Sequence, residues 1–219
     1  MGGIMVESIF SVTLRSLYIS SAASFFAFIS AVILSLIASR AEKKKADAIL
    51  GIFEALVGIP TTAIGLLIYM LLFPGGPLGS LRILYTPLAI IIGEIFVALP
   101  IAYTTMFRHF QSLRGTMREL VLSLGVPEKH TSSILLRELS PVLVSSYLTS
   151  FSRAIGELGV ALIAGGGIEG YTNVLTTAIA IQSSIGNYEY AIWLGLILIF
   201  MTIVLTLLLK FIGEYLIWK

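Results

Sequence analysis

The sequence of 219 residues contains no cysteine and few charged residues. The lack of cysteine excludes disulfides, thiolate metal sites and cysteine nucleophiles. Charged residues make up 12% of the chain and hydrophobic residues 57%. Soluble domains average roughly 25% charged residues, so this chain has too few polar groups to cover a surface in water. The composition excludes an ordinary soluble domain and favours an integral membrane protein.

Motifs for catalysis and nucleotide binding are also missing. A phosphate-binding loop needs a Gly-Lys step, and none of the six lysines follows a glycine. Asp47 is the only aspartate, which disfavours a Ser-His-Asp triad. His109 and His130 have no partner at metal-ligand spacing, so we interpret them as surface histidines. We therefore expect that the chain is not an enzyme and holds no metal or cofactor of its own.

Several apolar runs are long enough to cross a bilayer, which takes about 20 helical residues. The first lies between Arg15 and Arg40 and is longer than a signal-peptide core of about 7 to 15 residues, so we interpret it as a retained span. The second is interrupted by Glu54 and by Gly58-Ile59-Pro60. The five predicted spans are residues 16–39, 48–73, 88–107, 141–164 and 190–209. They predict an all-α integral membrane protein with a single domain, residues 1–219.

Basic residues are divided unequally between the two sides of the predicted bundle. Eleven of them lie on the side of the 40–47 connection, the 108–140 loop and the C-terminus. Only Arg15 and Arg82 lie on the other side, and Arg153 lies inside a span. Because Lys and Arg are retained on the cytoplasmic side of membrane proteins, we predict an external N-terminus and a cytoplasmic C-terminus.

A polar stripe follows one face of the fourth predicted span. Ser146, Ser150, Arg153 and Glu157 succeed one another at steps of four, three and four residues, which places them on one helical face. A charge at the centre of a bilayer costs about 2.5 to 3.5 kcal/mol, so such a residue is usually paired or functional. The stripe is either the wall of a polar pathway for an oxygen-rich solute, which we favour, or a helix–helix interface with one ion pair.

The loop between the third and fourth spans carries a motif with defined spacing. A short amphipathic helix ends at Gly125, and a second helix follows it. The segment resembles the coupling loop of ABC-importer permeases: Glu119, Gly125 and Ile134 match its pattern, whereas Leu120 and Val121 replace two alanines. The resemblance implies docking onto an ATPase subunit. The residues expected to dock are Arg118, Glu119, Leu120, Leu124, Gly125 and Pro127.

Further segments narrow the resemblance to oxyanion importers. Residues 58–65 look like the proline-containing helix of oxyanion-importer permeases. Residues 152–159 are similar to the Arg and Gly-Glu-x-Gly segment of molybdate, tungstate and sulfate permeases. Residues 76–79, 85–87 and 174–179 look most like the tungstate-type subgroup.

The resemblance implies a type I ABC importer permease with five core transmembrane helices in the plasma membrane of a prokaryote. The implied partners are a second copy of the chain, two ATPase subunits that bind ATP and Mg²⁺, and an external binding protein; no nucleic acid is implied. The transported solute would be a small oxyanion, tungstate or molybdate. Pro60 would shape a gate helix. The residues implied to line or gate the pathway are Ser146, Ser150, Arg153 and Glu157.

Two alternatives from other functional classes remain open at the level of sequence. An ion-coupled secondary carrier would relay protons through Glu54, Glu94 and Glu157. Such carriers often contain inverted repeats, and we find none in the sequence. A structural membrane subunit without a pathway would use the polar stripe only as an interface.

The predicted orientation can be tested with single cysteines, because the chain has none of its own. A cysteine at Ser80 or Ser184 should react with a membrane-impermeant thiol reagent in intact cells. A cysteine at Ser112 should react only after the cells are permeabilised. Labelling at Ser112 from outside would overturn the orientation that the basic residues predict.

Overall fold

The computed structural model describes residues 7–123 and 128–217, which are almost entirely helical. The described residues contain no strand, which confirms the all-α prediction. The helices are α1 (Ile9–Arg40), α2 (Lys43–Val57), α3 (Thr61–Leu72), the 3₁₀ helix η1 (Gly79–Leu81), α4 (Pro87–Ser123), α5 (Glu128–Ile155), α6 (Gly159–Ile163), α7 (Leu175–Ser184) and α8 (Tyr188–Ile217).

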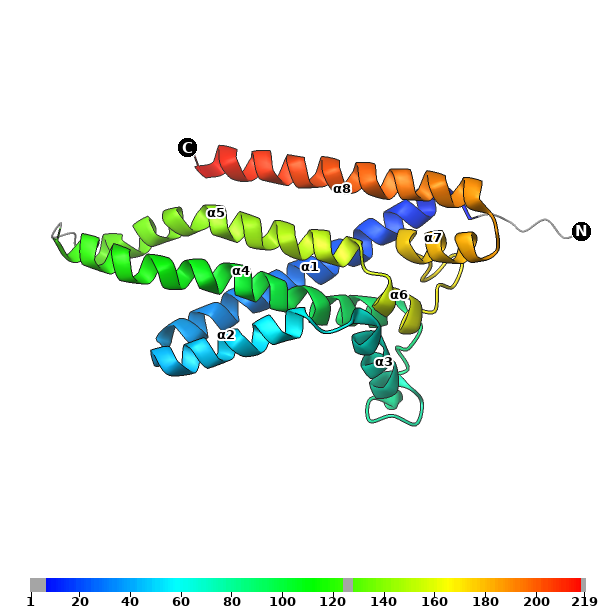
Figure 1. Cartoon of the computed structure of the whole chain (residues 1–219), viewed down its shortest axis with the longest axis horizontal. Coiled ribbons are helices and arrows are strands. Elements are labelled where there is room, and N and C mark those ends of the chain that lie inside the picture. The colour runs from blue at the N-terminus through cyan, green and yellow to red at the C-terminus, as the bar shows by residue number, and fades with distance from the viewer. Residues whose placement is uncertain (1–6, 124–127, 218–219) are drawn as a thin grey trace, which may run out of the picture.

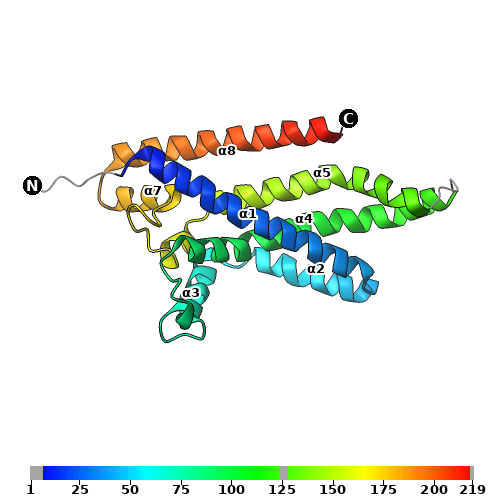
Figure 2. The same ribbon diagram turned by 180° about the vertical axis from the view of Figure 1, so that it is seen from behind.

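The helices form an elongated bundle (Figure 1). Helices α1, α2, α4, α5 and α8 run along its length, whereas α3 leaves it at a steep angle beside α6 and α7. The α1–α2 connection, the α4–α5 tip and the end of α8 lie at the opposite end, as the reverse view in Figure 2 also shows. The backbone positions of the basic residues that the sequence assigns to one side of the membrane, except Lys219, which lies outside the described residues, are therefore gathered at one end of the bundle.

Helix α1 packs closely on α4 because its inner face carries small residues. Ala23, Ala27 and Ala31 repeat every four residues and are fully buried, and small side chains let neighbouring helix backbones approach closely. Phe25 and Ile29 lie on the exposed side of α1. This division is expected of a helix that faces protein on one side and lipid on the other.

Helix α8 is apolar around most of its surface. Its exposed residues include Ile192, Trp193, Leu196, Ile199, Phe200 and Ile203. In water such a surface would be unfavourable, whereas hydrocarbon tails match it.

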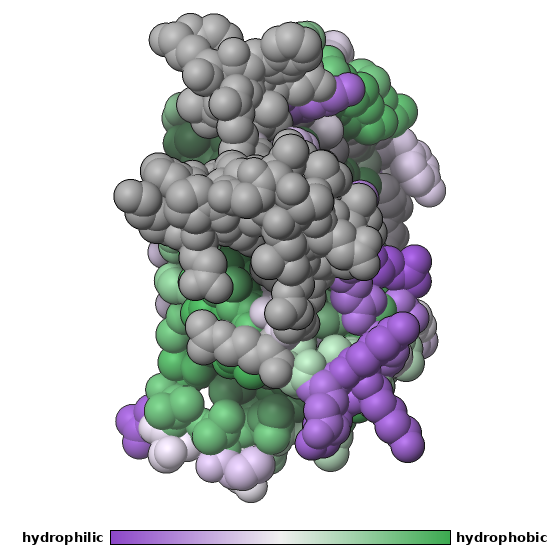
Figure 3. All heavy atoms as spheres, turned by 90° about the vertical axis from the view of Figure 1, so that its left-hand side faces the viewer, coloured by the Kyte–Doolittle hydropathy of each residue, from purple (hydrophilic) through white to green (hydrophobic). Residues whose placement is uncertain are grey.

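Figure 3 views the end of the bundle where α1 meets α2; hydrophilic atoms gather on one side, and Glu42 and Lys43 to Lys45 of this connection are exposed.

Three helices in the described residues are long and apolar enough to cross a membrane. These segments are Ile9–Ser39, Pro87–His109 and Tyr188–Leu208, and they coincide with the first, third and fifth predicted spans. The pair α2 and α3 gives a fourth candidate if it is counted as one broken span. The number of five spans and the orientation of the termini stay predictions.

The second predicted span, residues 48–73, is not one continuous helix. Helices α2 and α3 meet at an angle of 97°. Pro60 disfavours the α conformation at Ile59 and occupies the cap position at which α3 starts. The interruption expected at Gly58-Ile59-Pro60 is thus a sharp bend.

The fourth predicted span, residues 141–164, is also broken. Helix α5 ends at Ile155, and α6 starts at Gly159 after a short non-helical segment. Helix α5 begins well before Pro141, because a proline inside a helix bends it without always ending it. The short helix expected before Gly125 is the continuation of α4, whose backbone stays helical from Pro87 to Ser123.

The two breaks meet where α3 packs on α6. A Cβ atom added to Gly65 of α3 would lie 2.9 Å from the carbonyl oxygen of Gly159. A Cβ atom added to Gly159 would lie 2.8 Å from the backbone nitrogen of Thr62. Backbone atoms cannot move aside as a flexible side chain can, so both positions require glycine for this close approach.

We expect Gly65→Ala to destabilise the protein by about 1–3 kcal/mol, because the added methyl overpacks a backbone contact. Gly51→Ala in α2 is the matched control: its Cβ would have no neighbour within 4 Å, and alanine is the better helix former. Thermal unfolding in one lipid composition measures both variants. Equal unfolding temperatures for the two variants would contradict the close α3–α6 contact.

Candidate functional site

The Gly-Glu-x-Gly segment forms the break between α5 and α6. Gly156 is exposed in this break, whereas the side chain of Glu157 is only 1% exposed. The hydroxyl of Thr176 on α7 donates a hydrogen bond to the carbonyl oxygen of Glu157 at 2.9 Å. The break therefore places a carboxylate inside the bundle and is fixed to α7.

Arg153 and Glu157 form an ion pair across the end of α5. The distance from Nη1 of Arg153 to Oε2 of Glu157 is 2.9 Å. The other oxygen, Oε1, accepts a hydrogen bond from the backbone N–H of Val160 at 3.2 Å. Both oxygens of the buried carboxylate are thus satisfied, as a buried charge requires.

Arg153 is the half-exposed partner and reaches a cleft between α4, α5 and α8. Its side chain is 34% exposed. The cleft has a volume of about 390 Å³. The lining residues are Ile101, Leu148, Thr149, Ser152, Arg153 and Thr206. The hydroxyl of Thr149 donates to the backbone carbonyls of Ser145 and Ser146, whereas the hydroxyls of Ser152 and Thr206 and the guanidinium can donate hydrogen bonds to an anion.

The other two members of the polar stripe lie deeper in the bundle. Ser146 and Ser150 are fully buried. The hydroxyl of Ser146 donates to the carbonyl oxygen of Ala102 on α4 at 2.8 Å, and that of Ser150 donates to the carbonyl oxygen of Ser24 on α1 at 3.4 Å. Within one copy of the chain these hydroxyls connect helices and do not line the cleft. Their role in a pathway stays a prediction.

Pro60 lies on the surface at the start of α3. Because α3 packs on α6, the bend at Pro60 and the break at Glu157 are neighbours, although they are far apart in the sequence. Thr61 and Thr62, which follow Pro60, contact the backbone of Gly159. The structure thus brings together the two segments that carry the resemblance to oxyanion permeases.

Glu94 of α4 is a member of this site that the sequence pattern did not place. Its side chain is 1% exposed, and Ser20 of α1 donates a hydrogen bond to it. It lies close enough to Glu157 for the two carboxyls to interact electrostatically. A carboxyl inside an apolar span was the available signal, and the sequence analysis associated Glu94 with Glu157 only in the carrier alternative.

Three of the six residues predicted to dock onto an ATPase lie near the end of α4. The backbone of Arg118, Glu119 and Leu120 belongs to α4. Leu124, Gly125 and Pro127 lie outside the described residues. Docking by these six residues stays a prediction.

Comparison with protein families identifies the chain. A family model described as "Binding-protein-dependent transport system inner membrane component" matches residues 26–217. The chain belongs to this family of permeases. The match includes both helix breaks and the Arg153–Glu157 pair, and it confirms the resemblance to importer permeases.

Known relatives extend over most of this permease. The tungstate uptake system permease protein TupB of Peptoclostridium acidaminophilum is 30% identical over 191 residues, which are 87% of this chain and 84% of the relative. A probable anion ABC transporter permease of Haloferax volcanii is 29% identical over 204 residues, 91% and 88% of the two chains. The sulfate transport system permease CysT of Escherichia coli is 25% identical over 193 residues, 85% and 69%.

Arg15 is engaged in an ion pair at the α3–α7 end of the permease. Its Nη2 lies 2.7 Å from Oε1 of Glu7, and its Nη1 donates to the carbonyl oxygen of Asn173 at 2.7 Å. The hydroxyl of Tyr190 on α8 donates to the carbonyl oxygen of Glu7. This cluster ties the start of α1 to α8 and to the segment before α7. The positive charge of Arg15 is therefore paired with the carboxylate of Glu7.

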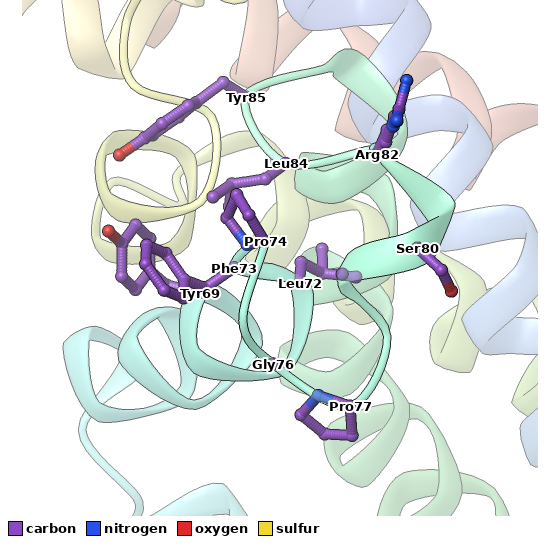
Figure 4. Close-up of a pocket in the computed structure, with 11 residues that line it drawn as sticks. Tyr69, Leu72, Phe73, Pro74, Gly76, Pro77, Ser80, Arg82, Leu84 and Tyr85 are labelled. Carbon is purple, nitrogen blue, oxygen red and sulfur yellow. The ribbon is translucent and has the colours of Figure 1, made fainter.

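A second cleft, of about 820 Å³, lies at the tip of α3. Figure 4 shows Tyr69 and Tyr85 on one side of it, with Arg82 pointing away from both rings. Arg82 and Tyr85 have φ angles of 52° and 60°, an uncommon conformation for residues other than glycine. No described carboxylate pairs with Arg82. The α3 tip therefore presents an unpaired positive charge.

The ion pair of Glu7 predicts a pH dependence of stability. Burial alone would raise the pKa of Glu7, but hydrogen bonds from Arg15 and Asn173 hold that pKa below its ordinary value of 4.5. A carboxyl whose pKa is lowered by folding stabilises the protein above its unfolded pKa, and this contribution is lost as the pH falls through the folded pKa.

We therefore expect Glu7→Gln to lower the unfolding temperature at neutral pH. The difference from the wild type should shrink as the pH falls below about 4.5. Thermal unfolding of both proteins across this range measures the effect. A difference that stays constant with pH would show that Glu7 acts by packing alone.

Proposed function

We propose that the permease is the membrane-spanning subunit of an ATP-driven type I importer for a tetrahedral oxyanion, with tungstate as the first candidate. The observation that carries this proposal is the Arg153–Glu157 pair at the edge of a hydroxyl-lined cleft. The relatives named for tungstate, anion and sulfate transport support the substrate class. Two copies of the chain, two ATPase subunits and an external binding protein would form the complete importer, in which five core helices of each copy cross the membrane.

The cleft suits transient contact with an oxyanion. Ser152 and Thr206 offer hydroxyl donors, and Arg153 offers a guanidinium whose charge is already shared with Glu157. A partly neutralised guanidinium attracts an anion without holding it tightly, and a solute must leave a pathway as readily as it enters. Arg153 and Glu157 therefore act as gate or pathway groups, and Pro60 shapes the neighbouring gate helix.

Movement of the ATPase subunits would reach this gate through α4. The helix is continuous from Pro87 to Ser123, so its tip and its membrane segment move together. Arg108 of α4 holds Glu54 of α2 through two hydrogen bonds of 2.7 and 3.0 Å. The side-chain amide of Gln111 on α4 donates to Asp47 of α2 at 2.9 Å. A displacement of the docked tip would thus pull on α2 and change the bend at Pro60.

The external binding protein would dock at the α3 tip. With the N-terminus outside, the cleft lined by Tyr69 and Tyr85 faces the exterior. Arg82 supplies an unpaired positive charge for an acidic partner surface there. The orientation test with single cysteines examines this assignment.

A proton-relay carrier fits the geometry less well. Glu54 lies at the surface and is paired with Arg108, which follows Glu94 by 14 residues on α4. That separation is about 21 Å along a helix, far beyond direct proton transfer. A structural subunit without a pathway is disfavoured because the matching family is described as a component of a transport system, and the match at residues 26–217 includes Arg153 and Glu157.

Reconstituted transport tests the proposal. Vesicles containing the permease and its ATPase subunits should take up tungstate only when ATP and the binding protein are both supplied. Uptake without ATP, driven by a proton gradient, would establish the carrier alternative.

The double variant Arg153→Met/Glu157→Leu separates a gate from a packing role. It should fold, because it removes both charges together, but its ATP hydrolysis should no longer respond to the substrate. Each single variant strands one partner and should be less stable than the double variant by about 3–5 kcal/mol. Unfolding and ATPase measurements in one lipid compare all three variants.

The matched control is Glu42→Gln/Lys45→Gln, which removes an exposed ion pair of 3.5 Å. Exposed pairs contribute about 0–1 kcal/mol, so this variant should behave as the wild type. A stable Arg153→Met/Glu157→Leu variant with normal ATP-coupled uptake would leave both residues as packing groups.

A further inference from the structure

The gate region contains more buried carboxyls than cations. Glu94 and Glu157 are 1% and 2% exposed and interact electrostatically. Arg153 pairs with Glu157. Oε2 of Glu94 has no hydrogen-bond partner. Among the described residues, one guanidinium therefore pairs with Glu157, whereas Glu94 has no cationic partner and one of its oxygens has no hydrogen bond inside the bundle.

The surroundings of Glu94 offer no further charge to balance it. From α1, Ser20 donates a hydrogen bond, and its neighbours Ile19 and Ala23 are apolar. From α6, the side chain of Val160 packs directly against Gly93. The titratable or charged groups that face Glu94 from the described helices are thus Glu157 and, through it, Arg153.

A resident metal ion does not fit this cluster. Hard cations such as Ca²⁺ take six to eight oxygen ligands. The described residues contain no group of three acidic or histidine side chains that could hold a metal ion. Two carboxyls and one serine hydroxyl leave most of such a coordination shell empty. A proton needs one oxygen only.

We propose that Glu94 and Glu157 together form a binding site for one proton, which resides on Glu94. An isolated buried carboxylate is so unfavourable that the group takes up a proton instead. The proton makes the cluster of Glu94, Glu157 and Arg153 electrically neutral. Glu157 stays the counter-ion of Arg153, and Glu94 is a neutral acid that borders the pair.

The proton site gives Glu94 a positioning role in the gate, a step that rests on the proposed function. A second negative charge beside Glu157 would compete for Arg153 and draw it away from the cleft. A neutral Glu94 leaves the guanidinium on Glu157, where it also reaches the cleft. The proton is a fixed part of the gate, and no relay through Glu54 is involved.

Infrared spectroscopy of the complete transporter in lipid tests the site without any substrate. A protonated carboxyl has a carbonyl band that a carboxylate lacks, and deuterium oxide shifts this band. The band should be present at neutral pH in the wild type and absent in Glu94→Gln. The matched control Glu54→Gln, which alters an exposed and paired carboxylate, should retain it. A spectrum of Glu94→Gln identical to that of the wild type would overturn the proposal.

Ser20→Ala provides a second variant that leaves the carboxyl in place. It removes the hydrogen bond to Glu94, so the carbonyl band should move to higher frequency without losing intensity. This shift reports the protonated group even if Glu94→Gln fails to fold. Absence of any shift or of the band itself would contradict a proton on Glu94.

Transport measurements then separate the two carboxyls. Glu94→Gln should lower ATP-dependent tungstate uptake less than Glu157→Gln does, because the amide is neutral and has the same shape as the protonated acid. Glu157→Gln should lower uptake by at least about ten-fold, because it strands Arg153. A larger loss of uptake in Glu94→Gln than in Glu157→Gln would contradict a proton on Glu94.

The infrared and transport measurements together distinguish failure of the proposed function from failure of the proton site. If the wild type transports no oxyanion but the infrared band disappears in Glu94→Gln, the result supports the proton site and contradicts the substrate assignment. If uptake is normal and the band is missing from the wild type, the importer stands and the proton site falls.

Discussion

The buried charge of Glu157 is the constraint on which the rest of this bundle depends. A carboxylate inside a membrane protein must be paired and hydrogen bonded, and Glu157 lies beyond the end of α5 at Ile155. Arg153 supplies the counter-ion, and the backbone N–H of Val160 supplies the second partner. The helix break at Glu157 is therefore needed to free that N–H for the carboxylate.

The break in turn requires a close neighbour, because its backbone cannot face lipid unsatisfied. Helix α3 provides this cover, and the glycines at positions 65 and 159 let the two backbones meet. The sharp bend at Pro60 directs α3 towards the break. One polar side chain thus accounts for two interrupted helices and for the glycines where they touch.

Continuous and broken helices divide the molecule into a stiff part and an adjustable part. Helices α1 and α4 are long and uninterrupted, and a row of alanines packs them together. The broken pairs, α2 with α3 and α5 with α6, lie beside them, and the ion pair of Arg153 and Glu157 lies at the break between α5 and α6. Coupling between distant sites in proteins is carried by packed side chains and rigid elements, and α4 is such an element.

Much of the fold followed from the sequence, and the site followed in part. The first, third and fifth spans were predictable because each is a long apolar run that is stable in lipid whatever its neighbours. The Arg153–Glu157 pair was predictable because its partners are four residues apart, although the helix expected to carry both ends at Ile155. The 97° bend was not, because a proline predicts an interruption but not its direction.

The sequence by itself determined the class of protein and the local features: apolar helices, basic connections, the Pro60 interruption and the polar face of α5. These depend on residues that are near one another in the chain. Only the tertiary structure decided that Ser146 and Ser150 are hydrogen bonded to α4 and α1, and that Glu94 is near enough to Glu157 for the two carboxyls to interact electrostatically. Such contacts join residues that are distant in sequence, and packing of the whole bundle sets their positions.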